Sequence, residues 1–199
     1  MNQRGMTLVE LLVTLVIASV IMAGIYEVVI NEGKAYNAQE QVAEVQQSVR
    51  VAMNQMVSDI RMAGYENDSS TSKIVIDQPV TPGSDELSVS YEYDNTTEHT
   101  MTYRLEGSQL IKQVTVTKDT GVSDTLEEIL LDGVDGFRFI YGLDTDNDGA
   151  VDSWVSAGGV TSKVIAIRVQ LSAHPLNPDL KGFSSRSLES VVALRNRLL

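Results

Sequence analysis

Acidic side chains alternate along one short segment of the chain, and this spacing suits the binding of a metal ion. The segment is residues 144–152, and its predicted ligands are Asp144, Asp146, Asp148, Ala150 through its carbonyl oxygen, and Asp152. Four carboxylates so close together repel one another unless a cation gathers them, and a hard cation with oxygen ligands fits them best. Gly149 supplies the sharp turn that such a loop needs. The pattern therefore predicts a calcium site.

The same segment also has an interpretation as an ordinary acidic turn. Its spacing matches the first part of an EF-hand calcium loop, but Val155 stands at the twelfth position, where that loop has a bidentate glutamate. The flanking residues predict strands rather than helices, and Asp148–Gly149 is a common hairpin dipeptide. Two interpretations stay open: a calcium site completed by outside oxygens or water, and a solvated turn.

Glu10 is the second residue that could do chemistry, because it lies inside an apolar run. The run extends from Met6 to Ile30, and no charged residue lies between Leu11 and Tyr26. About 20 apolar residues in a helix cross a bilayer, so the run predicts a transmembrane helix. An ionised carboxylate in that setting costs about 2 to 3 kcal/mol or more unless it is paired. Glu10 is therefore expected to need a positively charged partner.

The residues before Glu10 resemble the processing site of type IV prepilins. They comprise a short leader with the basic Arg4, then Gly5, then Met6, with the glutamate at the fifth place after the glycine. The resemblance implies that a prepilin peptidase cuts between Gly5 and Met6 and methylates the new N-terminus. It also implies that Glu10 meets the N-terminal ammonium of a neighbouring subunit during assembly. Met6 departs from the family, in which phenylalanine most often follows the cut. A simple uncleaved signal anchor is the alternative.

Beyond residue 30 the sequence turns polar, but apolar residues recur at three- and four-residue spacing. They are Val42, Val45, Val49, Ala52, Met53, Met56, Ile60 and Ala63. Such spacing lines one face of a helix, so the helix of the anchor is predicted to continue to Ala63. Gly64 is the expected stop, because glycine adopts the left-handed conformation without a side-chain clash. The apolar stripe is expected to be the face that a sheet covers.

After Gly64, short runs rich in Val, Ile, Thr and Tyr predict strands. These are Lys73–Asp77, Glu86–Tyr93, Thr100–Leu105, Gln109–Thr117, Ile129–Leu131, Gly136–Tyr141, Ser153–Ser156 and Lys163–Ser172. Gly107 and Ser108 are expected to close a hairpin, while Ser187–Leu199 fits a helix or a closing strand equally. The predicted fold is α+β: a long N-terminal helix, transmembrane in its first half and amphipathic in its second, packed on an antiparallel β-sheet.

Two further segments resemble PilW-type minor pilins. Asp59–Tyr65 resembles the end of the long helix in that family, and Val192–Asn196 resembles its final strand, as well as that of the J-type pseudopilins of type II secretion. The second resemblance favours a closing strand at the C-terminus. The prepilin-like processing site, the apolar run and the helical stripe together predict this division of the chain: a leader at 1–5, a transmembrane helix half at 6–30, an amphipathic helix half at 31–64 and a periplasmic β-rich domain at 65–199.

The resemblance implies a minor pilin, a structural subunit that helps to initiate or cap a type IV pilus after processing. The implied partners are the major pilin, other minor pilins, the prepilin peptidase and the inner membrane with its assembly platform. Arg4 predicts that the N-terminus lies in the cytoplasm and the globular domain in the periplasm. A pseudopilin of a type II secretion system is one alternative. A membrane-anchored calcium-binding adhesive domain is another.

Composition excludes several other classes of function. The formal net charge is −12, and only 6 of the 27 acidic residues precede Gly64, so the β-rich part repels phosphate backbones and no direct nucleic-acid binding is expected. The chain has no cysteine, which excludes disulfides and thiolate metal sites. Its two histidines have no metal-ligand or triad spacing around them. A structural protein is predicted rather than an enzyme.

Overall fold

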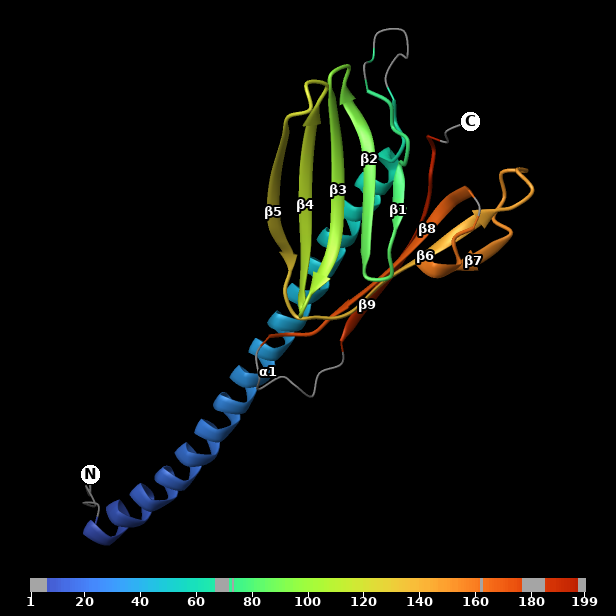
Figure 1. Cartoon of the computed structure of the whole chain (residues 1–199). Coiled ribbons are helices and arrows are strands. Elements are labelled where there is room, and N and C mark those ends of the chain that lie inside the picture. The colour runs from blue at the N-terminus through green and yellow to red at the C-terminus, as the bar shows by residue number, and fades with distance from the viewer. Residues whose placement is uncertain (1–6, 67–71, 73, 162, 177–184, 197–199) are drawn as a thin grey trace. The chain divides into compact units, whose positions relative to one another are not determined.

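The computed structural model describes residues 7–66, 72, 74–161, 163–176 and 185–196. The described residues form one long helix, α1 (Leu8–Met62), followed by strands and a short 3-10 helix, η1 (Ala157–Gly159) (Figure 1). The chain divides into two compact units, Met1–Ala43 and Glu44–Leu199. The first unit holds the N-terminal part of α1, and the second holds the rest of α1 and all the strands.

Helix α1 is 55 residues long. The first proline of the sequence is Pro79, so nothing within α1 removes a backbone donor or clashes with the preceding turn. The helix ends at Met62, one residue before the predicted Ala63. Gly64 has φ +68°, and Tyr65 N donates to Met62 O at 2.9 Å. A Cβ on Gly64 would lie 2.7 Å from the backbone oxygen of Asn196, so both the backbone angle and the close approach require glycine here.

Five strands form a first antiparallel sheet, sheet A, in the order β1-β2-β3-β4-β5. They are β1 (Val80–Pro82), β2 (Glu86–Asp94), β3 (Thr97–Glu106), β4 (Gln109–Lys118) and β5 (Ser123–Leu131). Each strand pairs with the next along the chain, as Figure 1 shows. Gly107, with φ +61°, lies in the tight turn between β3 and β4, where a hairpin was predicted.

Four strands form a second antiparallel sheet, sheet B, in the order β7-β6-β8-β9. They are β6 (Val134–Asp144), β7 (Ser153–Val155), β8 (Lys163–Ala173) and β9 (Arg186–Ala193). The C-terminal segment is thus a strand, as the resemblance favoured, but it ends at Ala193, and Leu194–Asn196 follow it. Residues 197–199 lie outside the described part of the chain.

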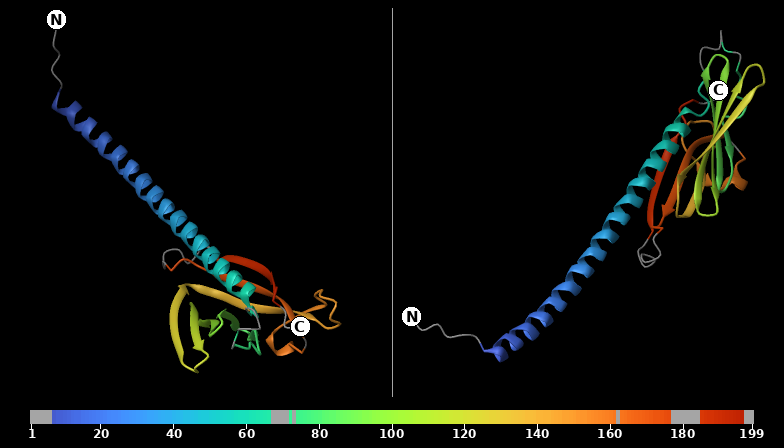
Figure 2. Two further views of the ribbon diagram at one scale, coloured as in Figure 1. Left: turned by 90° about the horizontal axis from the view of Figure 1, so that it is seen from above. Right: turned by 90° about the vertical axis from the view of Figure 1, so that its left-hand side faces the viewer.

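The core of the second unit joins the helix to both sheets. The predicted stripe supplies its helical side, with Val49, Ala52, Met53, Met56, Ile60 and Ala63 all buried. Residues from both sheets complete it, among them Tyr103 from sheet A and Tyr141 and Ile167 from sheet B. In both views of Figure 2 the last turns of α1 run beside β9, and Leu194, just after that strand, belongs to the same core. The amphipathic pattern of the helix is therefore satisfied by burial against strands.

The structure corrects three expectations about the strands. The strands divide into two sheets, where the sequence predicted one. The stretch Lys73–Asp77 is not a strand: Lys73 lies outside the described residues, and residues 74–77 form no ladder. Ile76 is buried, but its N–H donates to Glu66 Oε1 at 3.0 Å, so a side chain takes the place of a neighbouring strand. Strand β5 begins at Ser123, six residues before the predicted Ile129.

Candidate functional site

Helix α1 begins with a reciprocal pair of contacts between Thr7 and Glu10. The backbone N–H and the hydroxyl of Thr7 each donate to Glu10 Oε2 at 3.0 Å, and Glu10 N donates to Thr7 Oγ1 at 3.3 Å. This is a capping box, in which two side chains satisfy backbone donors that have no partner inside the helix. The T-x-x-E spacing is visible in the sequence, but the sequence reasoning considered Glu10 only as a charge. Gly5 and Met6, the predicted processing site, lie outside the described residues.

The first unit exposes a long apolar surface. All described side chains from Leu8 to Ile30 are exposed, including Leu15 at 63% and Val20 at 68%. The helix is long and apolar enough to cross a membrane, by length and composition. An apolar surface of this extent is found where lipid or another protein covers it.

Polar side chains within this apolar stretch are satisfied by the helix itself. Thr14 Oγ1 donates to Leu11 O at 2.9 Å, and Ser19 Oγ donates to Val16 O at 2.8 Å. Such back-bonding removes the need for water at these hydroxyls. Thr14 and Ser19 are therefore compatible with an apolar environment.

The acidic loop connects β6 to β7 in the second unit, and the structure brings three of its predicted ligands together. One carboxylate oxygen from each of Asp144, Asp146 and Asp152 lies within 4.8 Å of the other two. Asp144 is the last residue of β6 and is buried, with 4% of its surface exposed. Asp146 and Asp152 are exposed. Strand β6 thus supplies one buried carboxylate, and the loop supplies two exposed ones.

Backbone donors hold the loop in shape. Gly149 N donates to Asp144 Oδ2 at 3.1 Å, and Gly149 has φ +88°, so glycine is needed there. Thr145 N donates to Asp152 Oδ2 at 2.7 Å, while its hydroxyl donates to the same oxygen at 2.5 Å. These hydrogen bonds from the side chain and backbone of Thr145 lower the pKa of Asp152, because they favour its ionised form.

Two predicted ligands lie in the loop but outside the group of three. Asp148 Oδ1 accepts a hydrogen bond from Ala150 N at 2.7 Å, and the Asp148 carboxylate does not belong to the gathered set. Asp148 N also donates to Asp146 Oδ1 at 3.1 Å, so the turn is closed on itself. The roles of Asp148 and of the Ala150 carbonyl as ligands stay predictions.

Trp154 lies on β7, two residues after Asp152 of the loop. The guanidinium carbon of Arg168 lies 4.4 Å from the centre of its ring, a cation–π distance. Gly142 makes room for this packing, because a Cβ at that position would come within 3.1 Å of Val151 and 3.2 Å of the Trp154 ring. Sequence reasoning missed Arg168 and Gly142, since neither has a local signal that pairs it with β7.

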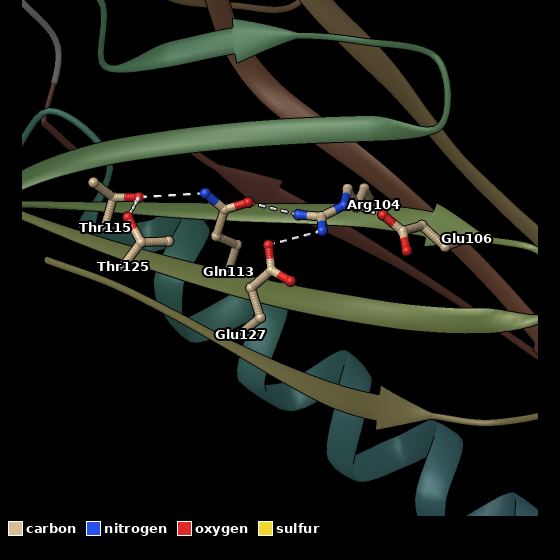
Figure 3. Close-up of polar contacts among 6 residues, drawn as sticks. All are labelled: Arg104, Glu106, Gln113, Thr115, Thr125 and Glu127. Carbon is tan, nitrogen blue, oxygen red and sulfur yellow. Dashed lines mark hydrogen bonds and ion pairs between the residues drawn. The ribbon is translucent and has the colours of Figure 1, made fainter.

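A polar network covers part of sheet A on the face away from the core (Figure 3). Arg104 lies at its centre: Nε contacts Glu106 at 2.7 Å, Nη2 contacts Glu127 at 2.9 Å, and Nη1 donates to Gln113 at 2.6 Å. Thr115 and Thr125 extend the row across β4 and β5. Arg104 alternates with the buried Tyr103 along β3, so the two side chains point to opposite faces. This network ties β3, β4 and β5 together.

Comparison with known protein families gives two matches on separate parts of the chain. Residues 106–190 match the family described as type IV pilus-assembly protein W. Residues 1–26 match the prokaryotic N-terminal methylation motif. The first match contains the acidic loop, β4 and β5 of sheet A and most of sheet B, and the second contains Gly5, Met6 and Glu10. No curated protein matches the chain.

Proposed function

Because the chain is a type IV minor-pilin-like protein, we propose that it is a minor pilin that helps to initiate or cap a filament. In this role the N-terminal helix first holds the subunit in the inner membrane. On assembly it leaves the lipid and packs against the helices of neighbouring subunits. The globular part stays outside the cytoplasm throughout. The function is structural, in keeping with a family of pilus-assembly proteins.

The observation that carries this proposal is the exposed apolar surface of α1 in the first unit, together with the methylation motif over the same residues. A helix with apolar side chains all around is stable in lipid, and equally in a bundle of similar helices. Either environment covers the same side chains. One segment can therefore act as a membrane anchor before assembly and as a packing element afterwards.

In this proposal Glu10 fixes how far the α1 helices of neighbouring subunits are shifted along one another. Cleavage between Gly5 and Met6 creates a new N-terminal ammonium, and the proposal pairs the ammonium of one subunit with Glu10 of its neighbour. In surroundings of low dielectric constant such a pair attracts much more strongly than in water. A misplaced subunit would leave the carboxylate without that partner, at a cost of several kcal/mol. The charge pair thus discriminates between correct and shifted helix packing.

The proposed orientation follows from Arg4, which precedes the apolar stretch and favours a cytoplasmic N-terminus. The prepilin peptidase would then meet the leader on the cytoplasmic side. The second unit, which carries most of the negative charge, would lie in the periplasm. Partners in this arrangement are other pilins, contacted through α1, and the assembly platform in the inner membrane.

Mass spectrometry of the full-length chain, extracted from membranes of cells that contain a prepilin peptidase, tests the proposal. The expected mass lacks residues 1–5 and carries one methyl group on Met6. A Gly5→Leu variant should keep its leader and run as the unprocessed chain. If the unaltered protein begins at Met1 in peptidase-containing cells, it is a simple anchored protein and the proposal is wrong.

A further inference from the structure

We propose that the β6–β7 loop binds a calcium ion through the carboxylates of Asp144, Asp146 and Asp152. The starting observation is that one oxygen from each lies within 4.8 Å of the others. Oxygen ligands of one calcium ion, at about 2.3 to 2.6 Å from the metal, are separated by at most about 5.2 Å. The three carboxylates are thus already spaced as ligands of a single ion.

A second observation points to a ligand independently of the acidic cluster. Asp144 is 96% buried, since only 4% of its surface is exposed. Its Oδ2 accepts from Gly149 N, but Oδ1 is buried without a hydrogen-bond partner. A buried carboxylate oxygen without a partner is unfavourable by a few kcal/mol. A cation held by the Asp144 carboxylate, with Asp146 and Asp152 beside it, removes that penalty.

Lys163 is the basic residue that could replace a metal ion here. It lies opposite Asp144 in the register of β6 and β8. Among the described residues, however, the ion pairs do not include one between Lys163 and Asp144, and Lys163 lines a hollow with Ala63 and Leu194. Arg168 is engaged with Trp154 and with Glu189, 3.6 Å from its Nε. Neither Lys163 nor Arg168 therefore neutralises the three carboxylates, and a cation from solution can bind them.

The ligand set selects the class of cation. All three donors are carboxylate oxygens, which favour hard ions such as calcium and magnesium over softer transition metals. Calcium accepts six to eight oxygens in an adaptable arrangement, whereas magnesium requires a tight octahedron at about 2.0 to 2.1 Å. An open loop with two exposed carboxylates suits the more adaptable ion. Water, Asp148 and the Ala150 carbonyl are available to complete the coordination.

Calcium would connect two strand ends that the backbone holds only weakly. Asp144 ends β6, and Asp152 directly precedes β7, a strand of only three residues at the edge of sheet B. An ion shared between them fixes the hairpin at the base of its connecting loop. Trp154, two residues after Asp152, is then held more firmly against Gly142 and Arg168. Calcium is thereby expected to order this edge of the domain.

Terbium luminescence tests the site, because Trp154 is the only tryptophan in the chain and terbium occupies calcium sites. The full-length protein in detergent micelles is titrated with terbium while tryptophan is excited. The expected result is a saturable terbium emission that calcium displaces at concentrations at least ~10-fold lower than magnesium. Emission that never saturates, or that magnesium displaces as well as calcium does, would overturn the proposal.

Matched variants locate the ion. Asp146→Asn keeps an oxygen that can accept from Asp148 N but removes one negative ligand, and it should weaken calcium binding by about 10-fold or more. Asp124→Asn removes an exposed charge on β5 and should leave binding within about twofold of the unaltered protein. In chelator, Asp146→Asn should melt at the same temperature as the unaltered chain or slightly higher, because one repelling charge is gone. Added calcium should raise the melting temperature of the unaltered chain by more than that of the variant. Equal calcium affinity in Asp146→Asn and Asp124→Asn would contradict the site. Leader cleavage is read separately by mass, so failure here leaves the proposed pilin role testable.

Discussion

Lys112 Nζ lies 3.0 Å from Asp59 Oδ2 and joins β4 to the last turns of α1. Both side chains are mostly covered, with 9% and 17% of their surface exposed. The hydroxyl of Tyr103, on β3, donates to the same Asp59 oxygen. Burial, followed by the charge of Asp59, raises the pKa of Tyr103 far above its usual value, so this hydroxyl stays protonated and acts as a donor. The helix is thereby tied to two neighbouring strands of sheet A by polar contacts as well as by apolar packing.

Asp59→Ala is expected to lower the free energy of unfolding by about 3 kcal/mol, because it leaves the Lys112 ammonium covered without its partner. Urea unfolding of the micelle-bound chain, followed by Trp154 fluorescence, measures this. The double variant Asp59→Leu/Lys112→Met should recover part of the loss, since both charges are then gone but the Tyr103 hydroxyl has lost its acceptor. A single variant as stable as the unaltered chain would show that the pair contributes nothing.

Substitutions at the start of α1 separate the charge of Glu10 from its capping role. Gln is accepted at the third position of a capping box, so Glu10→Gln should keep the helix start but prevent incorporation into filaments. Thr7→Ala removes the cap, at about 1 kcal/mol, and keeps the charge, so incorporation should persist. Immunoblots of sheared filaments measure both variants, with Glu27→Gln on the same helix as a control. Normal incorporation of Glu10→Gln would contradict the proposed charge pairing.

Two glycines with similar backbone angles give a matched test of the helix stop. Gly107→Ala should cost about 1 kcal/mol, because φ is +61° but no atom lies within 4 Å of the new Cβ. Gly64→Ala should cost clearly more, about 2 to 3 kcal/mol, because its Cβ would also meet the Asn196 oxygen at 2.7 Å. Urea unfolding of both variants checks the difference. Equal losses would mean that the C-terminal segment moves aside freely.

His99 is expected to make stability depend on pH. Its ring stacks on Tyr93 with centroids 4.5 Å apart, and burial lowers its pKa from 6.5, although the nearby Asp94 charge opposes the shift. The unfolded chain therefore takes up the His99 proton first as the pH falls through 6.5, and stability declines from there down to the lower folded-state pKa.

NMR titration of the imidazole measures the midpoint of His99 directly, and His99→Phe should remove its share of the pH dependence of urea unfolding. His174→Gln serves as the control, because it changes the other histidine of the chain. A His99 midpoint at or above 6.5 would refute the expectation.

The parts of the fold that the sequence predicted are those that local periodicity determines. Met53, Met56 and Ile60 recur at helical spacing, and a helix that buries one face needs no further information. Strand β5 could not be predicted over Ser123–Glu128, because its residues there are exposed and become a strand only by pairing with β4. The separation into two sheets is equally a matter of pairing between distant segments.

The acidic loop shows the same division between local and distant information. The alternation of Asp144, Asp146 and Asp148, followed by Asp152, predicts a candidate cation site from sequence alone. Which carboxylates converge depends on how β6 and β7 pair. The burial of the Asp144 oxygen depends on the packing of residues from distant parts of the sequence. The capping box, by contrast, is a purely local feature, because the T-x-x-E spacing of Thr7 and Glu10 is enough to predict it.

The backbone N–H and the hydroxyl of Thr7 both donate to Oε2 of Glu10, so the second oxygen of this carboxylate is left for another donor. In the proposed assembly, a neighbour's ammonium would therefore meet a carboxylate that the subunit's own helix start has already positioned. The Thr7 donors reduce the cost of the Glu10 charge in an apolar environment without neutralising it. Before assembly the carboxylate would thus be oriented by its own chain, and only a neighbour's N-terminus would supply the counter-charge.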